Sequence, residues 1–129
     1  MNWIYRNKEL TSIPKGKYGF IYEIVYSNGK KYIGKKNFYH NKTLKPLKGK
    51  KRKRKVTVES DWKTYEGSPK KTLSNHVTIV SKKILKIVEN KTQLTYFEAE
   101  ALFKHKVLLS DNYLNGNILG KFYKTKDLK

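Results

Sequence analysis

The chain contains no cysteine among its 129 residues, and this absence excludes disulfide frameworks, thiolate zinc sites and cysteine nucleophiles. It also lacks any run of the roughly 18–20 apolar residues that a membrane span requires. The first ten residues do not contain the apolar segment of a signal peptide. We therefore expect an intracellular, cytoplasmic protein that has no membrane partner.

Acidic side chains are scarce as well. The sequence has 10 Asp and Glu against 30 Lys and Arg, which gives a formal net charge of +20 at pH 7. A folded body with that excess repels itself, and a polyanion relieves the repulsion, so nucleic acid is the leading partner. Arginine is almost absent, with Arg6, Arg52 and Arg54 alone. Because lysine contacts phosphate as a point charge, the composition predicts affinity for the nucleic-acid backbone and says little about sequence specificity.

The length suits one domain covering residues 1–129, because single cores commonly run to about 100–150 residues. An aromatic content of 13% separates the chain from disordered basic tails, which lack such residues. Residues 1–18 contain Pro14 and Gly16 and predict a loop. The order of the later elements predicts an α+β fold with a small, mostly antiparallel three-stranded sheet flanked by helices.

The strongest local pattern is a β-hairpin over residues 19–35, with Asn28-Gly29 at its turn. A two-residue loop would place Tyr22 and Tyr32 on opposite faces of the sheet. A three-residue loop, with Gly29 in the left-handed conformation of a bulge, would bring both rings to one face. Both registers are open on the sequence alone.

A basic insert at about residues 37–60 follows the hairpin. Its like charges repel one another, so we expect a solvated loop or a splayed ribbon, with a short strand at Val56–Val58. The residues that follow, Ser60–Tyr65, predict a short helix capped by the Ser60 hydroxyl.

The last part of the chain predicts one strand and one long helix. The strand covers about residues 80–88, which are β-branched and interspersed with lysines. The helix covers about residues 95–109, where Thr95 and Glu98 have the spacing of a capping box. Residues 111–120 are rich in Asn and Gly and predict irregular structure.

Several of these segments together resemble a known family. Gly19–Tyr22 followed by Tyr32–Lys35 looks like the tyrosine signature of the GIY-YIG nucleases, with Phe20 inserted in the first element. That family carries a metal-binding glutamate on a later helix, here Glu100, and an asparagine in a closing turn, here Asn117. The resemblance implies the GIY-YIG nuclease fold and phosphodiester hydrolysis.

The two tyrosines are candidates for activating water. Cleavage of a phosphodiester needs a nucleophilic water and a cation against the developing charge. Tyr22 is our candidate general base and Tyr32 its partner, since neighbouring lysines would stabilise a phenolate. Gly34 would let the phosphate backbone approach closely. The alternatives are half-buried strand aromatics and a strand glycine that faces Tyr22.

The resemblance implies that Glu100 binds a divalent cation. One carboxylate together with substrate oxygens and waters suits Mg²⁺ or Mn²⁺. We assign Glu98 to the capping box and Glu100 to the chemistry. Asn117 would hold a backbone or ligand in place, or else it is a residue that tolerates a turn next to Gly116.

The sequence departs from the family in its phosphate-binding cation, because lysines stand where members of the family have an arginine. Lys36 and Arg52 are joint candidates to replace it. Lys35 points away from the tyrosines in the bulged register and is a candidate nucleic-acid contact, as is Gly34. His40 is a candidate proton shuttle, with a surface histidine as the alternative.

The basic run within the insert is the predicted grip on DNA; a disordered loop or a localisation signal is the alternative. Its candidate contacts are Lys50, Lys51, Arg52, Lys53, Arg54 and Lys55. We therefore expect a metal-dependent endonuclease of the phage or mobile-element type that acts on double-stranded DNA as a monomer or homodimer. A non-catalytic nucleic-acid-binding module on the same scaffold is the second hypothesis, and a basic RNA-associated protein is the third.

Overall fold

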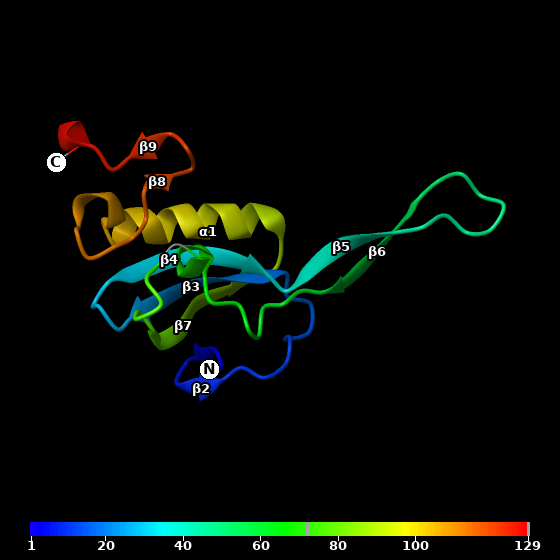
Figure 1. The fold of residues 1–129 in the computed structure, drawn as a ribbon, viewed down its shortest axis with the longest axis horizontal. Coiled ribbons are helices and arrows are strands. Elements are labelled where there is room, and N and C mark those ends of the chain that lie inside the picture. Colours follow the sequence, from blue (N-terminus) through cyan, green and yellow to red (C-terminus); the bar gives the residue numbers. More distant parts are fainter. Residues whose placement is uncertain (72, 129) are drawn as a thin grey trace.

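A five-stranded mixed β-sheet forms the centre of the protein (Figure 1). The structure, a computed structural model, describes residues 1–71 and 73–128. The strand order is β2-β1-β7-β3-β4; β7 pairs antiparallel with β3 and β3 with β4, whereas β1 runs parallel to β7. The bounds are β1 Ile4–Tyr5, β2 Lys8–Glu9, β3 Gly19–Tyr26, β4 Lys31–Asn37 and β7 Ile79–Val88.

The prediction of a three-stranded, mostly antiparallel sheet flanked by helices is therefore wrong. The predicted strands are β3, β4 and β7, but residues 1–18, expected to be a loop, add β1 and β2, and the described residues contain a single α-helix. Each added strand has two residues, too few for side-chain alternation to be visible in a sequence. Trp3 anchors this segment: it is 1% exposed, and its indole nitrogen donates a hydrogen bond to the Trp62 carbonyl at 2.5 Å.

Of the two registers that the sequence left open, the hairpin adopts the bulged one. Tyr22 lies opposite Gly34 on the neighbouring strand, and Tyr32 lies opposite Ile24. Gly29 has the left-handed φ of +83° that a three-residue loop requires. Tyr22 and Tyr32 therefore project from the same face of the sheet.

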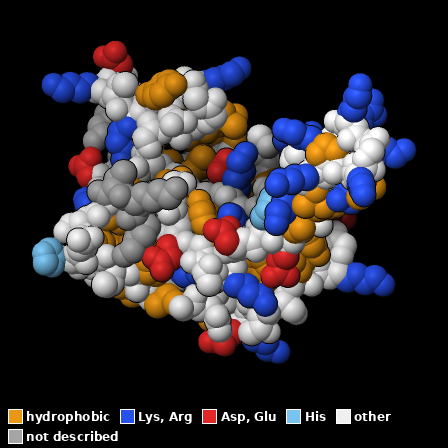
Figure 2. Space-filling view, turned by 45° about the vertical axis from the view of Figure 1, so that its right-hand side comes forward, with side chains coloured by type: hydrophobic (Ala, Val, Ile, Leu, Met, Phe, Trp, Pro, Cys, Tyr) orange, Lys and Arg blue, Asp and Glu red, His pale blue; other side chains and the backbone are white. Residues whose placement is uncertain are grey.

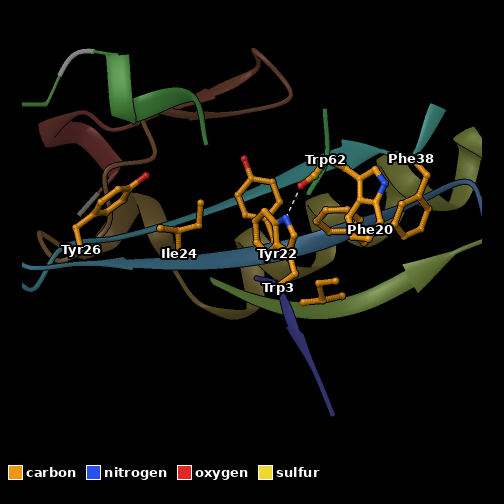
Figure 3. Close-up of a cluster of buried hydrophobic side chains, with 8 residues drawn as sticks. Trp3, Phe20, Tyr22, Ile24, Tyr26, Phe38 and Trp62 are labelled. Carbon is orange, nitrogen blue, oxygen red and sulfur yellow. Dashed lines mark hydrogen bonds between the residues drawn. The ribbon is translucent and has the colours of Figure 1, made fainter. Parts of the chain in front are cut away.

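Each face of the sheet packs against its own core. The tyrosine face carries an aromatic cluster (Figure 3) that consists of Trp3, Phe20, Tyr22, Ile24, Tyr26, Phe38, Trp62 and Ile84. The opposite face is covered by helix α1 (Lys91–Lys104), whose Leu94 and Leu102 pack in one cluster with Ile33 of β4. Because Trp62 is fully buried in the aromatic cluster, its ring is not available to stack on a base.

Helix α1 begins and ends earlier than predicted. Its N-cap is Asn90, whose side chain accepts a hydrogen bond from the Gln93 amide at 2.8 Å, so the predicted capping box of Thr95 and Glu98 is wrong. Lys106 has a left-handed φ of +51° and separates α1 from the short turn η2 (Val107–Leu109). Glu98 consequently lies inside the helix, and its side chain does not cap the helix start.

The insert after the hairpin forms a two-stranded ribbon, β5 (Tyr39–Leu44) with β6 (Arg54–Glu59), which projects from the body (Figure 1). This outcome confirms the predicted strand at residues 56–58. The predicted helix at Ser60–Tyr65 is wrong, because that segment forms turns. The Ser60 hydroxyl donates to the Asn37 carbonyl at 2.6 Å instead of capping a helix.

The remaining elements are short: η1 (Ser68–Lys71), β8 (Asn117–Ile118), β9 (Phe122–Tyr123) and η3 (Lys126–Leu128). β8, which lies within residues 111–120 where the sequence predicted irregular structure, pairs with β9. None of the helices in the described part of the chain is long and apolar enough to cross a membrane.

Candidate functional site

Three tyrosines gather at the β4 edge of the sheet. The ring centroid of Tyr22 lies 6.2 Å from that of Tyr32 and 6.0 Å from that of Tyr65. The Tyr65 hydroxyl lies 3.2 Å from the Ser68 hydroxyl. The bulged hairpin supplies the first two rings, and the turns that follow the ribbon supply Tyr65, which the sequence presented only as the end of a predicted short helix.

Gly34 makes room for this cluster. A Cβ at position 34 would lie 2.5 Å from the Tyr22 hydroxyl oxygen and 2.9 Å from the Tyr32 ring. On the tyrosine face, the space above Gly34 is thus filled by the Tyr22 phenol. The alternative, a strand glycine that faces Tyr22, is what the structure contains.

The phenols of Tyr22 and Tyr32 are held in their neutral form. Burial, followed by the neighbouring Tyr65 and Tyr32, raises the pKa of Tyr22 far above its ordinary value. Burial also raises the pKa of Tyr32, while a hydrogen bond with Ser68 acts in the opposite direction. The expected lowering of the Tyr22 pKa by lysines is not what its surroundings produce, because the ring is 1% exposed.

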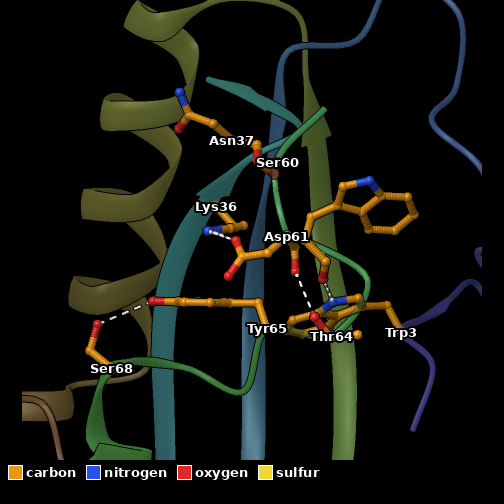
Figure 4. A network of polar contacts seen from close by, with 9 residues as sticks. Trp3, Lys36, Asn37, Ser60, Asp61, Thr64, Tyr65 and Ser68 are labelled. Atoms are coloured by element: carbon orange, nitrogen blue, oxygen red, sulfur yellow. Dashed lines mark hydrogen bonds and ion pairs between the residues drawn. The ribbon is translucent and has the colours of Figure 1, made fainter. Parts of the chain in front are cut away.

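Lys36 is the cation beside the tyrosines. Its ammonium lies 4.1 Å from the Tyr65 ring centroid and 2.6 Å from a carboxylate oxygen of Asp61 (Figure 4). The hydrogen bond from Lys36 is the largest of the effects that lower the pKa of Asp61. Arg52, the other candidate, lies in the loop at the end of the ribbon, so only Lys36 is next to the phenols.

The carboxylate that α1 brings toward this edge belongs to Glu98. Its side chain is 17% exposed and lies 3.9 Å from the Lys35 ammonium. Burial raises the pKa of Glu98, and the charge of Glu98 in turn acts on the Tyr32 phenol. Lys35 therefore lies on the helix side of the sheet, opposite the tyrosine rings, as the register predicted.

Glu100 lies on another side of the helix, away from the tyrosine edge, and the capping-box role that we gave Glu98 is wrong. Residues two apart on a helix are separated by about 200° around its axis. Glu100 is exposed and lines a separate pocket of about 220 Å³ together with Lys86 and His105. The sequence misled because the helix start was placed too late, which made Glu98 resemble a cap.

Asn115, which the sequence did not single out, is bonded to strand β4 through its side chain. Its side chain is buried at 5% exposure, accepts a hydrogen bond from the Ile33 amide at 3.1 Å and donates one to the Ile33 carbonyl at 2.7 Å. Asn117, the predicted site residue, is exposed and accepts from the Gly120 amide at 2.9 Å within its own turn. Asn115 thus holds the strand that carries Tyr32 and Gly34.

An open groove of about 650 Å³ connects the tyrosine edge with the ribbon. Its lining combines residues of the body and the ribbon: Tyr18, Lys35, Lys36, Asn37, Tyr39, His40, Asn41, Thr57, Ser60 and Tyr65. His40 is close enough to Asp61 to help lower the pKa of that carboxyl. Figure 2 shows Lys and Arg side chains gathered on the projecting arm beside this groove.

The predicted grip residues lie on this arm, with Lys50, Lys51, Arg52 and Lys53 in its end loop and Arg54 and Lys55 on β6. All six are exposed. The structure thus places them at the far end of the arm, away from the phenols, and none of them lines the groove.

The donor set near the tyrosines suits a hard divalent cation bound through few protein ligands. Within residues 1–71 and 73–128, no group of three or more His, Asp or Glu side chains could hold a metal ion. A single half-buried carboxylate, Glu98, fits Mg²⁺ or Mn²⁺, which keep several waters and take further oxygens from a substrate phosphate.

The groove is lined by Lys35, Lys36 and His40 and borders the tyrosine cluster through Tyr65, an arrangement suited to a polyanion. Residues 3–118 match the family described as "Putative endonuclease segE, GIY-YIG domain". The chain therefore belongs to the GIY-YIG family, which is a family of nuclease domains. Neither the curated proteins nor the solved structures contain a match to the chain.

Proposed function

We propose that the chain is a metal-dependent endonuclease that hydrolyses phosphodiester bonds in double-stranded DNA. The observation that carries the proposal is the cluster of the Tyr22, Tyr32 and Tyr65 rings beside Lys36, with Glu98 close enough to Tyr32 for its charge to raise the pKa of that phenol. Membership of a nuclease family gives the reaction class, and the groove gives the substrate a path to the phenols.

In this proposal Glu98 binds the cation, and Mg²⁺ or Mn²⁺ supplies positive charge against the phosphate oxygens when bound. Lys36 leaves Asp61 for the scissile phosphate, because a dianionic transition state attracts the ammonium more strongly than one carboxylate does. The lysine then takes the position of the arginine found in other members of the family.

We assign the general base to Tyr32 and give Tyr22 the supporting role, in reverse of the order expected from the sequence. Tyr22 is 1% exposed and cannot contact a water in the groove, whereas Tyr32 is half-buried. As a general base, Tyr32 must first release its own proton to solvent, and the hydrogen bond from Ser68 favours the resulting phenolate. The phenolate then takes one proton from the attacking water. His40, in the groove, is placed to protonate the leaving oxygen.

The non-catalytic nucleic-acid-binding module is the second candidate, and one observation favours it. Lys36 is already paired with Asp61 at 2.6 Å, so the cation nearest the phenols is neutralised in the free protein. A module of this kind would bind DNA tightly without dependence on a divalent cation.

Nicking of supercoiled plasmid separates the two candidates. We expect nicking with Mg²⁺ or Mn²⁺, none with chelator, and a loss of about 100-fold or more in Glu98→Gln. Glu100→Gln is the matched control on the same helix and should nick at the wild-type rate. Absence of metal-dependent nicking, or equal nicking by Glu98→Gln and wild type, would overturn the nuclease proposal.

A further inference from the structure

The β5–β6 ribbon is exposed along its length but rigidly attached at its base. Every residue of both strands is exposed or half-buried. At the base, Phe38 is fully buried, with its ring centroid 5.1 Å from that of Trp62, and the Ser60 amide donates to the Phe38 carbonyl at 2.8 Å. A two-stranded ribbon without a core is marginally stable in water. A partner that covers it would account for its retention.

The charge of the ribbon identifies the chemistry of that partner. Residues 39–59 contain a single acidic residue, Glu59, against nine basic ones: Lys42, Lys45, Lys48, Lys50, Lys51, Arg52, Lys53, Arg54 and Lys55. Three of these residues lie on the strands and six in the end loop, so the arm concentrates positive charge where a polyanion can bind it.

We propose that the ribbon lies in the major groove of duplex DNA and reads base edges there, an inference that rests on the proposed function. The major groove is about 12 Å wide and admits a two-stranded ribbon. Six residues at about 3.4 Å each give roughly 20 Å, the length of about six base pairs. The basic side chains of the end loop would contact the flanking phosphates.

One face of the ribbon carries the groups suited to reading bases. Alternation places Asn41 and Thr57 on the same face, where they are register partners and the Thr57 hydroxyl donates to the Asn41 amide oxygen at 3.2 Å. The opposite face includes Val56 and Val58. An asparagine amide pairs with the N6 and N7 edge of adenine, and the threonine methyl group packs against the methyl group of thymine.

The reading face is continuous with the candidate catalytic site. Asn41 and Thr57 line the same groove as Lys36 and Tyr65. A duplex seated along the ribbon would therefore present a backbone phosphate to Lys36 at a fixed distance from the bases that are read. The major groove of duplex RNA is too deep and narrow for a ribbon, so the geometry favours DNA.

Selection from a random duplex DNA library by the full chain tests this inference, with chelator present so that cleavage plays no part. We expect an enriched motif of about six base pairs. In Asn41→Ala with Thr57→Ala, discrimination should fall about tenfold at one or two positions of the motif. Asn75→Ala with Thr78→Ala, an exposed pair outside the ribbon, is the matched control and should keep the motif.

An unchanged motif in the ribbon variant, absence of any motif, or tighter binding to duplex RNA of the same sequence would each overturn the inference. Asn41→Gln is a second test variant. It keeps the amide but displaces it, so it should change the preferred base at the same positions. Binding is measured without cleavage, so a protein that selects the motif but never nicks would remove the nuclease proposal and keep the ribbon inference.

Discussion

Gly34 lies opposite Tyr22 on the neighbouring strand, and the Tyr22 phenol occupies the space that any side chain at position 34 would fill. Gly34→Ala should therefore displace the phenols of Tyr22 and Tyr32 and lower the free energy of unfolding by about 1–3 kcal/mol, the usual cost of overpacking. Urea denaturation measures this loss.

Gly116→Ala is the matched control, because a Cβ at that position would meet nothing within 4 Å. It should leave the urea midpoint close to that of the wild type. If Gly34→Ala is as stable as Gly116→Ala and nicks plasmid normally, the tight packing of the Tyr22 phenol on Gly34 is needed neither for stability nor for activity.

Asn115 joins the closing turn to the strand that carries Tyr32. Asn115→Ala removes both hydrogen bonds to Ile33 and leaves a buried amide and carbonyl unsatisfied, so the free energy of unfolding should fall by roughly 2–3 kcal/mol. Asn117→Ala removes one exposed bond and should cost about 0.5–1 kcal/mol. Thermal or urea unfolding measures both losses. A larger loss of stability in Asn117→Ala than in Asn115→Ala would contradict this account.

The pH dependence of stability reports on Glu98. Burial raises its pKa in the folded protein, so the folded state binds the proton more tightly than the unfolded state does. Stability contributed by the neutral carboxyl is present below the unfolded-state pKa and is lost as pH rises through the raised folded-state pKa. Glu98→Gln should thus gain stability relative to wild type between acidic and neutral pH.

Denaturation of wild type, Glu98→Gln and Glu100→Gln across this range checks the sign, and Glu100→Gln should show no such gain. The nicking rate of the wild type should rise over the same pH range, which lies above the ordinary range of a glutamate, because cation binding needs the ionised form. A nicking rate that falls as Glu98 ionises would contradict its role as the cation ligand.

Salt dependence measures the contribution of the end loop. Replacing Lys50, Lys51, Arg52 and Lys53 by Gln should reduce the log–log salt slope of DNA binding by up to about 3–4, since each phosphate contact contributes about 0.9. The matched control replaces four exposed lysines elsewhere: Lys91, Lys104, Lys121 and Lys126. Equal slopes for the two variants would show that the charge acts globally and not through the ribbon.

Local chemistry made some elements predictable from the sequence. The Asn-Gly turn and the alternation around it predicted the hairpin but not its register, because both loop lengths place Gly29 at a positive φ. The strand at Ile79–Val88 and the existence of α1 followed from β-branched content and apolar spacing.

Contacts between distant parts of the chain were not predictable in the same way. β1 and β2 are held by Trp3, whose indole bonds to a residue 59 positions away, and Asn115 reaches 82 positions back to Ile33. The choice between Glu98 and Glu100 depended on where α1 begins, and helix ends are the least certain part of any pattern. A shift of two residues exchanges the buried and exposed faces of the helix.

The central claim is that Tyr32 and Glu98 act as one site, and a double-mutant cycle of single-turnover DNA cleavage tests it most directly. Tyr32→Phe and Glu98→Gln should each reduce the rate by about 100-fold or more, and the double variant should be little slower than the slower single variant, because residues that act as a unit are non-additive. Tyr96→Phe, an exposed tyrosine on α1, is the control. Losses that multiply in the double variant, or a Tyr32→Phe rate equal to that of Tyr96→Phe, would contradict the account.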